Sequence, residues 1–322
     1  MLGADFQTGK DRCVRSAEMM RVIPFVLATI WLVLASRMTA QDNAQLEIGG
    51  GKIDVAFSST PAEPLRKLVL GWIASSARAV TVYYERFPVS HLQLEIRFIE
   101  GSRVRGGRTT GWNGAKITIA VGRSITSADF ADDWMLTHEM VHLAFPSVAE
   151  EHHWIEEGSA TYIEPIARAR AGDLTPEKVW GDLVDGLPQG LPEPGDRGLD
   201  LTPTWGRTYW GGALFCLLAD IEIRKRTGNE KGLEDALRAI LNAGGTIESD
   251  WPLTRALEIG DRATGVPVLR ELYDKMKAAP VPVDLKALWK QLGVQRRDGK
   301  IEFDDAAPLA SIRRAITKRK TR

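Results

Sequence analysis

Hydrophobic and polar residues alternate in three short segments of the first third of the chain, a pattern typical of β-strands. These segments are residues 53–57, 92–98 and 116–121. Residues 63–87 begin within the Pro-containing sequence PAEP and predict one long helix between the first two segments. Residues 101–111 are rich in Gly and Arg, which indicates a loop or a hairpin.

Helical segments dominate after residue 128. The predicted helices are residues 129–144, 154–169, 208–226 and 232–241, and most of the C-terminal remainder is also expected to be helical. A long surface loop is predicted at 187–203, which is rich in Pro and Gly, and a hairpin is predicted around Asp298 and Gly299. Strands first and helices afterwards predict an α+β fold, with a small N-terminal sheet lobe followed by a mostly helical lobe.

The N-terminal segment, residues 1–40, has the layout of a secretory signal peptide. An apolar run of fifteen residues, 22–36, follows Arg15 and Arg21 and precedes small or polar residues. We therefore expect a secreted or periplasmic protein. The alternative is that the apolar run stays in place as a membrane anchor.

Length and composition narrow the class of protein. The 322 residues are enough for one large domain or two small ones, and we expect a sheet-bearing subdomain at 41–128, a helical subdomain at 129–245 and a helical C-terminal region at 246–322. Lys plus Arg and Asp plus Glu number 42 each, so no net charge attracts nucleic acid. Cys13 precedes the apolar run and leaves Cys216 alone, so no internal disulfide is expected. We expect a monomer.

Residues 136–143 contain the pattern HExxH, formed by His138, Glu139 and His142. Residues four apart lie on one face of a helix, so both imidazoles can bind one metal ion. Glu139 is rotated by about 100° from His138 and can reach a water on the metal without binding the metal itself. The metal acidifies that water and Glu139 takes its proton. The alternative is an ordinary amphipathic helix with two surface histidines.

A zinc site needs a third protein ligand and leaves a fourth position open for catalysis. In the metzincin pattern this ligand is a His or Asp six residues after the second His, but that position is Val148. The residue types that bind zinc return shortly afterwards. The candidates from residue type alone are His152, His153, Glu156 and Glu157.

The sequence WIEEGSA at 154–160 resembles the W-x-x-E-G-x-A signature of gluzincin-type zinc metallopeptidases. In the aminopeptidase N-like and glycyl aminopeptidase families the Glu before the Gly is the third zinc ligand, and the matching residue is Glu157. Fourteen residues separate His142 from Glu157, fewer than in those families. Glu156, His152 and His153 stay open as competing ligands.

A second resemblance lies at YWGGAL, residues 209–214, which is similar to the Y-x-K-G pattern of the same families. Their Tyr donates a hydrogen bond to the oxyanion of the tetrahedral intermediate, and Tyr209 matches it, while Gly211 replaces the Lys. The alternative is an aromatic residue packed on the core at the start of a helix. The resemblance covers about residues 132–241 and implies a zincin-like fold, with the active-site helix between the two lobes.

Gluzincins bind the substrate backbone along an edge strand near the active-site helix, by adding the peptide to the sheet. The segment that we expect to do this is 116–121. The sequence lacks the Gly-rich, Glu-containing motif with which the aminopeptidases capture a free N-terminus. Arg103, Arg105 and Arg108 are expected to be solvated loop charges.

The sequence thus predicts a zinc-dependent peptidase with a peptide or protein substrate, its zinc-binding catalytic part lying at 129–245. His138, His142 and Glu157 are expected to bind Zn²⁺. Glu139 would activate water and then protonate the leaving amine, and Tyr209 would stabilise the oxyanion. Two alternatives are an inactive gluzincin-like scaffold that binds peptides or envelope components, and a zinc hydrolase of a non-peptide amide or ester.

Overall fold

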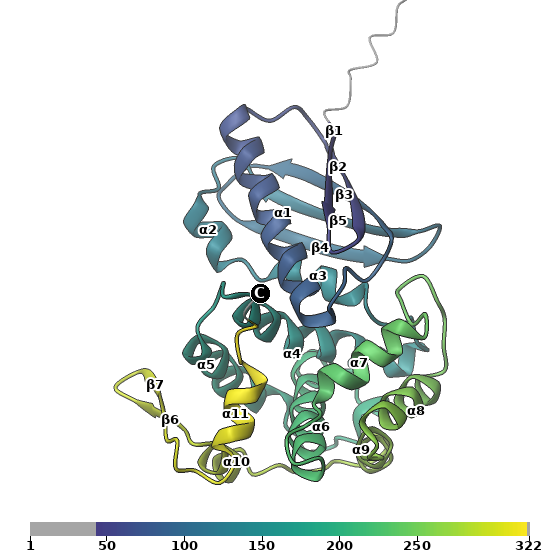
Figure 1. Ribbon diagram of the computed structural model, residues 1–322, viewed down its shortest axis with the longest axis vertical. Helices are drawn as coiled ribbons and strands as arrows, with labels where there is room; N and C mark the ends of the chain where they lie inside the picture. Colours follow the sequence, from purple (N-terminus) through teal and green to yellow (C-terminus); the bar gives the residue numbers. More distant parts are fainter. Residues whose placement is uncertain (1–42, 321–322) are drawn as a thin grey trace, which may run out of the picture. The chain divides into compact units, whose positions relative to one another are not determined.

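A five-stranded sheet forms the N-terminal part of the computed structural model, which describes residues 43–320. The strand order is β1-β2-β3-β5-β4 (Figure 1). The strands are β1 (Asn43–Ile48), β2 (Gly51–Phe57), β3 (His91–Ile99), β4 (Val104–Thr110) and β5 (Ala115–Gly122). The three central strands run parallel, while β1 and β4 pair antiparallel at the two edges.

The expected signal or anchor segment, residues 1–40, lies outside the described residues. All of the described residues belong to one compact unit. Within residues 43–320, no helix combines the length and the apolar character that a membrane span requires.

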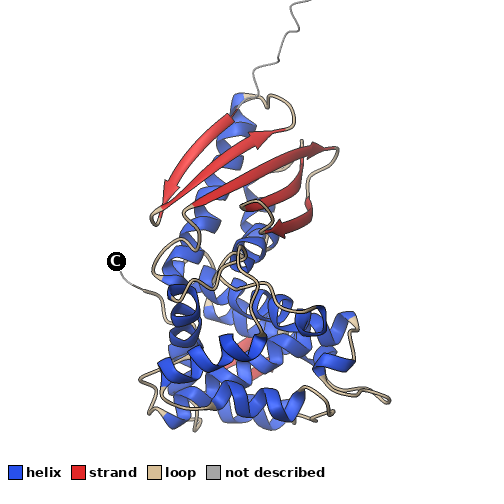
Figure 2. Cartoon of the chain, turned by 90° about the vertical axis from the view of Figure 1, so that its right-hand side faces the viewer, coloured by secondary structure: helices blue, strands red, loops and turns tan. Residues whose placement is uncertain are grey.

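Helix α1 (Glu63–Tyr84) joins β2 to β3 and lies across one face of the sheet (Figures 1 and 2). It is the long helix predicted over 63–87. Its buried residues recur every three or four positions, as in Val69, Ile73 and Val80, which are fully buried. This spacing gives the helix an apolar stripe that covers the sheet.

The edge strand of the sheet differs from the one that the sequence predicts. The Gly- and Arg-rich segment 101–111 forms β4, which is antiparallel to β5 and has an irregular register between Arg105 and Arg108. The segment 116–121, predicted as the substrate-binding edge, belongs to β5 and lies between β3 and β4. That prediction was wrong, because both backbone edges of β5 are already paired. The edge strands are β1 and β4.

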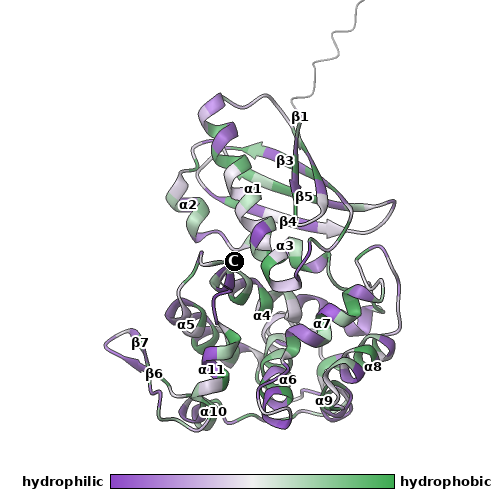
Figure 3. Cartoon of the chain, viewed as in Figure 1, coloured by the Kyte–Doolittle hydropathy of each residue, from purple (hydrophilic) through white to green (hydrophobic). Residues whose placement is uncertain are grey.

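Helices make up most of the chain after β5, as predicted. They are α2 (Ser127–Asp132), α3 (Met135–His142), α4 (His153–Ala171), α5 (Pro176–Gly186), α6 (Gly212–Arg226), α7 (Leu233–Asn242), α8 (Leu253–Thr264), α9 (Val268–Met276), α10 (Leu285–Leu292) and α11 (Ala310–Ile316). Hydrophobic and hydrophilic residues interleave along most of them (Figure 3), so these helices have one face for the core and one for solvent, whereas α3 and α6 are buried on nearly all sides. A small hairpin, β6 (Val294–Arg297) and β7 (Lys300–Phe303), confirms the predicted turn at Asp298 and Gly299.

The helix predicted over 129–144 is divided into α2 and α3. The break lies at Asp133, whose backbone is extended at the end of α2. The Asp133 carboxylate accepts hydrogen bonds from Trp72 Nε1 at 3.0 Å and from the backbone N–H of Leu136 at 3.3 Å. It therefore caps the start of α3 and anchors it to α1, a tertiary contact that local periodicity does not report.

Helices α4 and α6 cross in close contact at two glycines. A Cβ on Gly158 would lie 2.3 Å from the backbone of Gly212, and a Cβ on Gly212 would lie 2.1 Å from the carbonyl oxygen of Trp154. Both distances are far below van der Waals contact, so neither position accepts a side chain without separating the helices. Gly158, the glycine of the WIEEGSA sequence, is therefore required for the close packing of α4 on α6.

The substitution Gly158→Ala is expected to lower the free energy of unfolding by about 1–3 kcal/mol, because the added methyl group overpacks the crossing. Denaturant titration followed by circular dichroism measures this change. Gly71→Ala is the matched control, since Gly71 also lies within a helix but has open space around its Cβ position. It is expected to raise stability by about 0.5–1 kcal/mol through helix propensity. Equal effects of the two substitutions would contradict the tight crossing.

Candidate metal centre

Helix α3 carries the HExxH pattern on a buried segment. It packs against α1, α4 and the edge strand β4. His138 and Glu139 are 4% and 7% exposed. The alternative of two surface histidines on an amphipathic helix therefore does not fit the structure.

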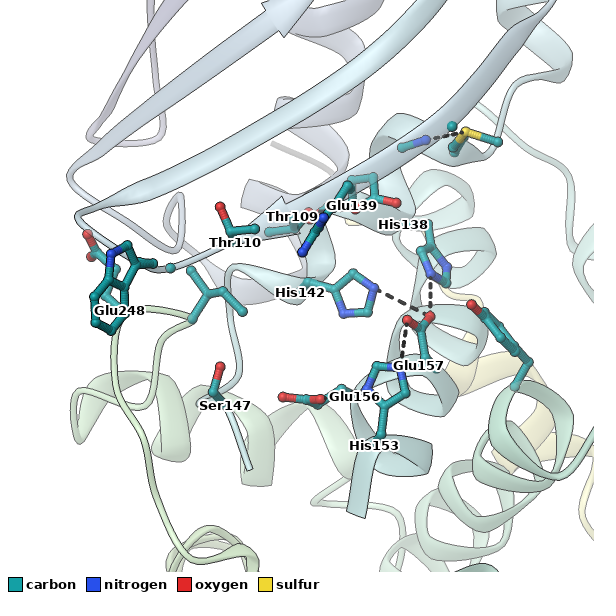
Figure 4. Close-up of a pocket in the computed structure, with 18 of the residues that line it drawn as sticks. Thr109, Thr110, His138, Glu139, His142, Ser147, His153, Glu156, Glu157 and Glu248 are labelled. Atoms are coloured by element: carbon teal, nitrogen blue, oxygen red, sulfur yellow. Dashed lines mark hydrogen bonds and ion pairs between the residues drawn. The ribbon is translucent and has the colours of Figure 1, made fainter. Parts of the chain in front are cut away.

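Helix α4 brings Glu157 against both histidines of α3. Glu157 Oε2 lies 3.1 Å from His138 Nε2 and 3.6 Å from His142 Nε2 (Figure 4). The three potential ligand atoms lie within 4.8 Å of one another, and among residues 43–320 no other three His, Cys, Asp or Glu side chains form such a group. The structure thus brings together the three residues that the sequence predicts as ligands.

The protonation states of this cluster suit a metal ion. Burial lowers the pKa of His138 and so favours its neutral form. Burial also opposes ionisation of Glu157, but the hydrogen bonds and charges of the two imidazoles hold its pKa far below the usual range. Burial lowers the pKa of His142, but the hydrogen bond and charge of Glu157 outweigh this effect, so the pKa is raised overall. Because an imidazole that binds a metal must be neutral, a metal ion bound here would compete with protonation of His142.

The competing ligands lie outside the cluster. His153 Nδ1 is 2.9 Å from Glu156 Oε2, and His153 Nε2 is 3.4 Å from the outer oxygen of Glu157. His152 instead pairs with Asp200 at 3.1 Å. His153 therefore contacts Glu157 from the side, and the hydrogen bond that His153 makes to the Glu156 carboxylate raises the pKa of His153.

The edge strand β4 holds the side chain of Glu139. Thr109 Oγ1 lies 2.6 Å from Glu139 Oε2 and 2.9 Å from the Glu139 carbonyl oxygen (Figure 4). At Gly107 a Cβ would come within 2.6 Å of Glu139 Oε1, so the strand leaves room for the carboxylate only because this residue is glycine. Neither Thr109 nor Gly107 was predictable as a site residue from the sequence, where the only signal was the glycine content of 101–111.

Tyr209 lies in a π-helical turn, Arg207–Gly211, that leads directly into α6. Its ring is stacked near the His138 ring, with centroids 6.3 Å apart. Burial raises the pKa of Tyr209 to about 12, with Glu157 and Glu139 adding to the effect. The phenol therefore keeps its proton at neutral pH and can donate a hydrogen bond beside the cluster. Single π turns recur at functional sites.

A cavity of about 940 Å³ opens at the cluster, and we call it the main cleft. One wall is β4, the floor is formed by α3 and α4, and a further wall is the loop containing Ile247, Glu248 and Asp250. This volume lies within the range of ligand-binding clefts. The sequence patterns did not indicate that the loop at 247–250 would reach the site.

The fold is similar to that of a solved aminopeptidase N family protein. The structure of an aminopeptidase N family protein from Idiomarina loihiensis superposes with a TM-score of 0.61 at 14% identity, covering 80% of this chain and 50% of that chain. An M1 zinc metallopeptidase variant from Deinococcus radiodurans gives 0.49 at 15% identity, covering 75% and 52%. A variant of that enzyme bound to a Tyr-Ser-Ala substrate gives 0.49 at 12%, covering 76% and 52%.

At 14% identity the first of these similarities establishes the fold alone, and the two with TM-scores below 0.5 add no argument. The chain spans about half the length of these structures. No protein-family model matches the chain. No curated protein matches it either. The described residues thus have an α+β fold like that of an aminopeptidase N family protein, with the cluster of His138, His142 and Glu157 between sheet and helices.

Proposed function

We propose that this chain is a zinc-dependent peptidase, which hydrolyses peptide bonds. The observation that carries the proposal is the cluster of His138, His142 and Glu157 beside Glu139 on the floor of the main cleft. Two imidazoles and one carboxylate form a donor set that suits catalytic zinc and leaves a position open. The low pKa of Glu157 and the neutral form of His138 fit the same ion.

Zinc bound by these residues would supply a Lewis acid that polarises the substrate carbonyl and lowers the pKa of a water molecule. Glu139 would take the proton of the attacking water and pass it to the leaving amine. Thr109 would hold the Glu139 carboxylate in place through its hydroxyl. Tyr209 would donate its phenolic proton in a hydrogen bond to the developing oxyanion.

A peptide substrate is favoured by the edge strand β4. Its residues from Gly106 to Thr110 line the main cleft, and within the described residues one edge of β4 pairs with no other strand. An extended peptide can add to such an edge through backbone hydrogen bonds. The same strand holds Glu139, so a bound peptide would run past the proposed base. We further propose export, from the apolar run at 22–36, and a monomeric state.

Digestion of a peptide library with the purified full-length chain tests the proposal. Cleavage products identified by mass spectrometry are expected with zinc-loaded protein, to disappear after chelation and to return with one equivalent of zinc. Hydrolysis of ester or amide substrates without any peptide cleavage would favour the non-peptide hydrolase instead. Peptide binding without turnover of either class would favour the inactive scaffold.

A further inference from the structure

A second cavity, of about 450 Å³, opens beside the metal centre. Trp134, His138 and Tyr209 line both this cavity and the main cleft, so the two are neighbours across these three rings. The second cavity extends between α4 and α5, where Pro165 and Leu174 add apolar surface. The second cavity therefore lies next to the place where a substrate held in the main cleft would meet the metal centre.

Four rings form a continuous row, three of them at the boundary between the two cavities and the fourth, Trp205, in the lining of the second cavity alone. Trp134 meets His138 edge to face at 5.3 Å between centroids. His138 and Tyr209 are stacked at 6.3 Å, and Tyr209 and Trp205 are stacked at 5.7 Å. A group that enters the second cavity from the main cleft passes beside His138, a proposed zinc ligand. The second cavity is thus placed to bind the side chain of a substrate residue close to the scissile bond.

The tryptophans at this boundary expose large apolar surfaces. Trp134 is 49% exposed and Trp205 is 60% exposed. Within residues 43–320 only five large hydrophobic side chains are exposed, and the third tryptophan among them, Trp112, lines the main cleft. Exposed apolar surface gathered around cavities marks a site that a ligand covers. Trp205 stacks on Tyr209 with one face, and packing alone does not explain why the rest of its ring is exposed at a cavity.

The charged groups that line the cavity are mostly neutralised by one another. Glu164 and Arg168 are both buried and form an ion pair at 2.8 Å, while Lys178 and Asp182 pair at 2.7 Å. Both cations are therefore already paired and offer little to an acidic ligand. Asp132 and Asp185, two exposed carboxylates in the lining, would repel one, and Asp185 is already paired with Arg296 at 2.7 Å.

We propose that the second cavity binds a large aromatic side chain of the substrate, next to the scissile bond, and that Trp205 is the main specificity-determining residue. This inference rests on the proposed peptidase function. Apolar walls, aromatic edges and faces, and internally paired charges together suit an uncharged ring that stacks on Trp205.

Binding to a catalytically blocked protein tests the cavity without turnover. In the zinc-loaded Glu139→Gln protein, calorimetry compares the peptide Ala-Ala-Phe-Ala-Ala with peptides carrying Asp or Lys at the centre. The Phe peptide is expected to bind about tenfold more tightly than either. Adding Trp205→Ala is expected to reduce this ratio to about twofold or less. Trp205→Phe, which retains a ring, is expected to keep most of the ratio.

The control is Leu201→Ala, which removes another exposed apolar side chain that lines neither cavity, and it should keep the full ratio. Equal affinities for the three peptides, a preference for Lys, or a ratio unchanged by Trp205→Ala would overturn the proposed cavity. Cleavage mapping separates the two proposals. Peptide cleavage by the wild-type chain without an aromatic residue beside the cut would overturn the cavity alone. An intact Phe preference in binding, with no peptide cleaved by the wild-type chain, would overturn the peptidase alone.

Discussion

Glu157→Ala is expected to lower the affinity for zinc at least about 100-fold, so that the purified variant retains no stoichiometric metal. Glu157 Oε2 is the atom that both histidines of α3 approach, at 3.1 and 3.6 Å. Its removal leaves two imidazoles, one protein ligand fewer than a catalytic zinc site uses. Metal content by mass spectrometry, after dialysis against a weak chelator, measures the loss against one zinc per wild-type chain.

Glu156→Ala and His153→Ala are the matched controls, because both residues lie on the same helix within four positions of Glu157. His153 contacts Glu156 and the outer oxygen of Glu157, and both His153 and Glu156 lie outside the ligand cluster. Both variants are expected to keep close to one zinc per chain. Zinc lost from folded Glu156→Ala and retained in Glu157→Ala would assign the third ligand to Glu156. Circular dichroism of each variant shows whether the fold is kept.

Glu139→Gln is expected to lower kcat for peptide hydrolysis by about 10²–10⁴-fold while zinc content stays unchanged. Glutamine has the shape of glutamate and can still accept the hydrogen bond from Thr109, so the side chain stays in place. It cannot take a proton from the attacking water. The measurement is kcat on a fluorogenic peptide, with zinc content determined on the same samples.

The control for this loss is Glu177→Gln, the same chemical change at an exposed position in the first turn of α5. Its kcat is expected to match the wild type. A Glu139→Gln protein that keeps one zinc and more than a tenth of the wild-type kcat would show that another group is the base.

The parts of the fold and site that depend on local geometry were predictable from the sequence. The HExxH spacing places His138 and His142 on one face of α3, because a helix repeats every 3.6 residues. The hairpin at Asp298 and Gly299 also depends on local geometry alone. Both residues have positive φ, which a two-residue type I′ hairpin turn requires. The order of strands followed by helices is likewise visible in the hydrophobic pattern.

The parts that depend on contacts between distant segments were not predictable. Strand order is a tertiary property, so nothing within 116–121 shows that β4 covers its free edge. Thr109 and Glu139 are thirty residues apart and meet only because β4 lies over α3. The second cavity is assembled from α4, α5 and the segment containing Trp205 and Tyr209, and no short motif records that assembly.

The crossing of α4 and α6 decides which sequence changes can alter the site. Gly158 and Gly212 meet backbone to backbone, with no rotatable side chain between them. Glu157 directly precedes one glycine, and Tyr209 lies three residues before the other. The spacing between the carboxylate and the phenol is therefore set by two main chains. Substitutions in the surrounding core can lower Tm and leave this spacing intact, so the rest of the lobe is free to diverge in sequence while Glu157 and Tyr209 keep their places.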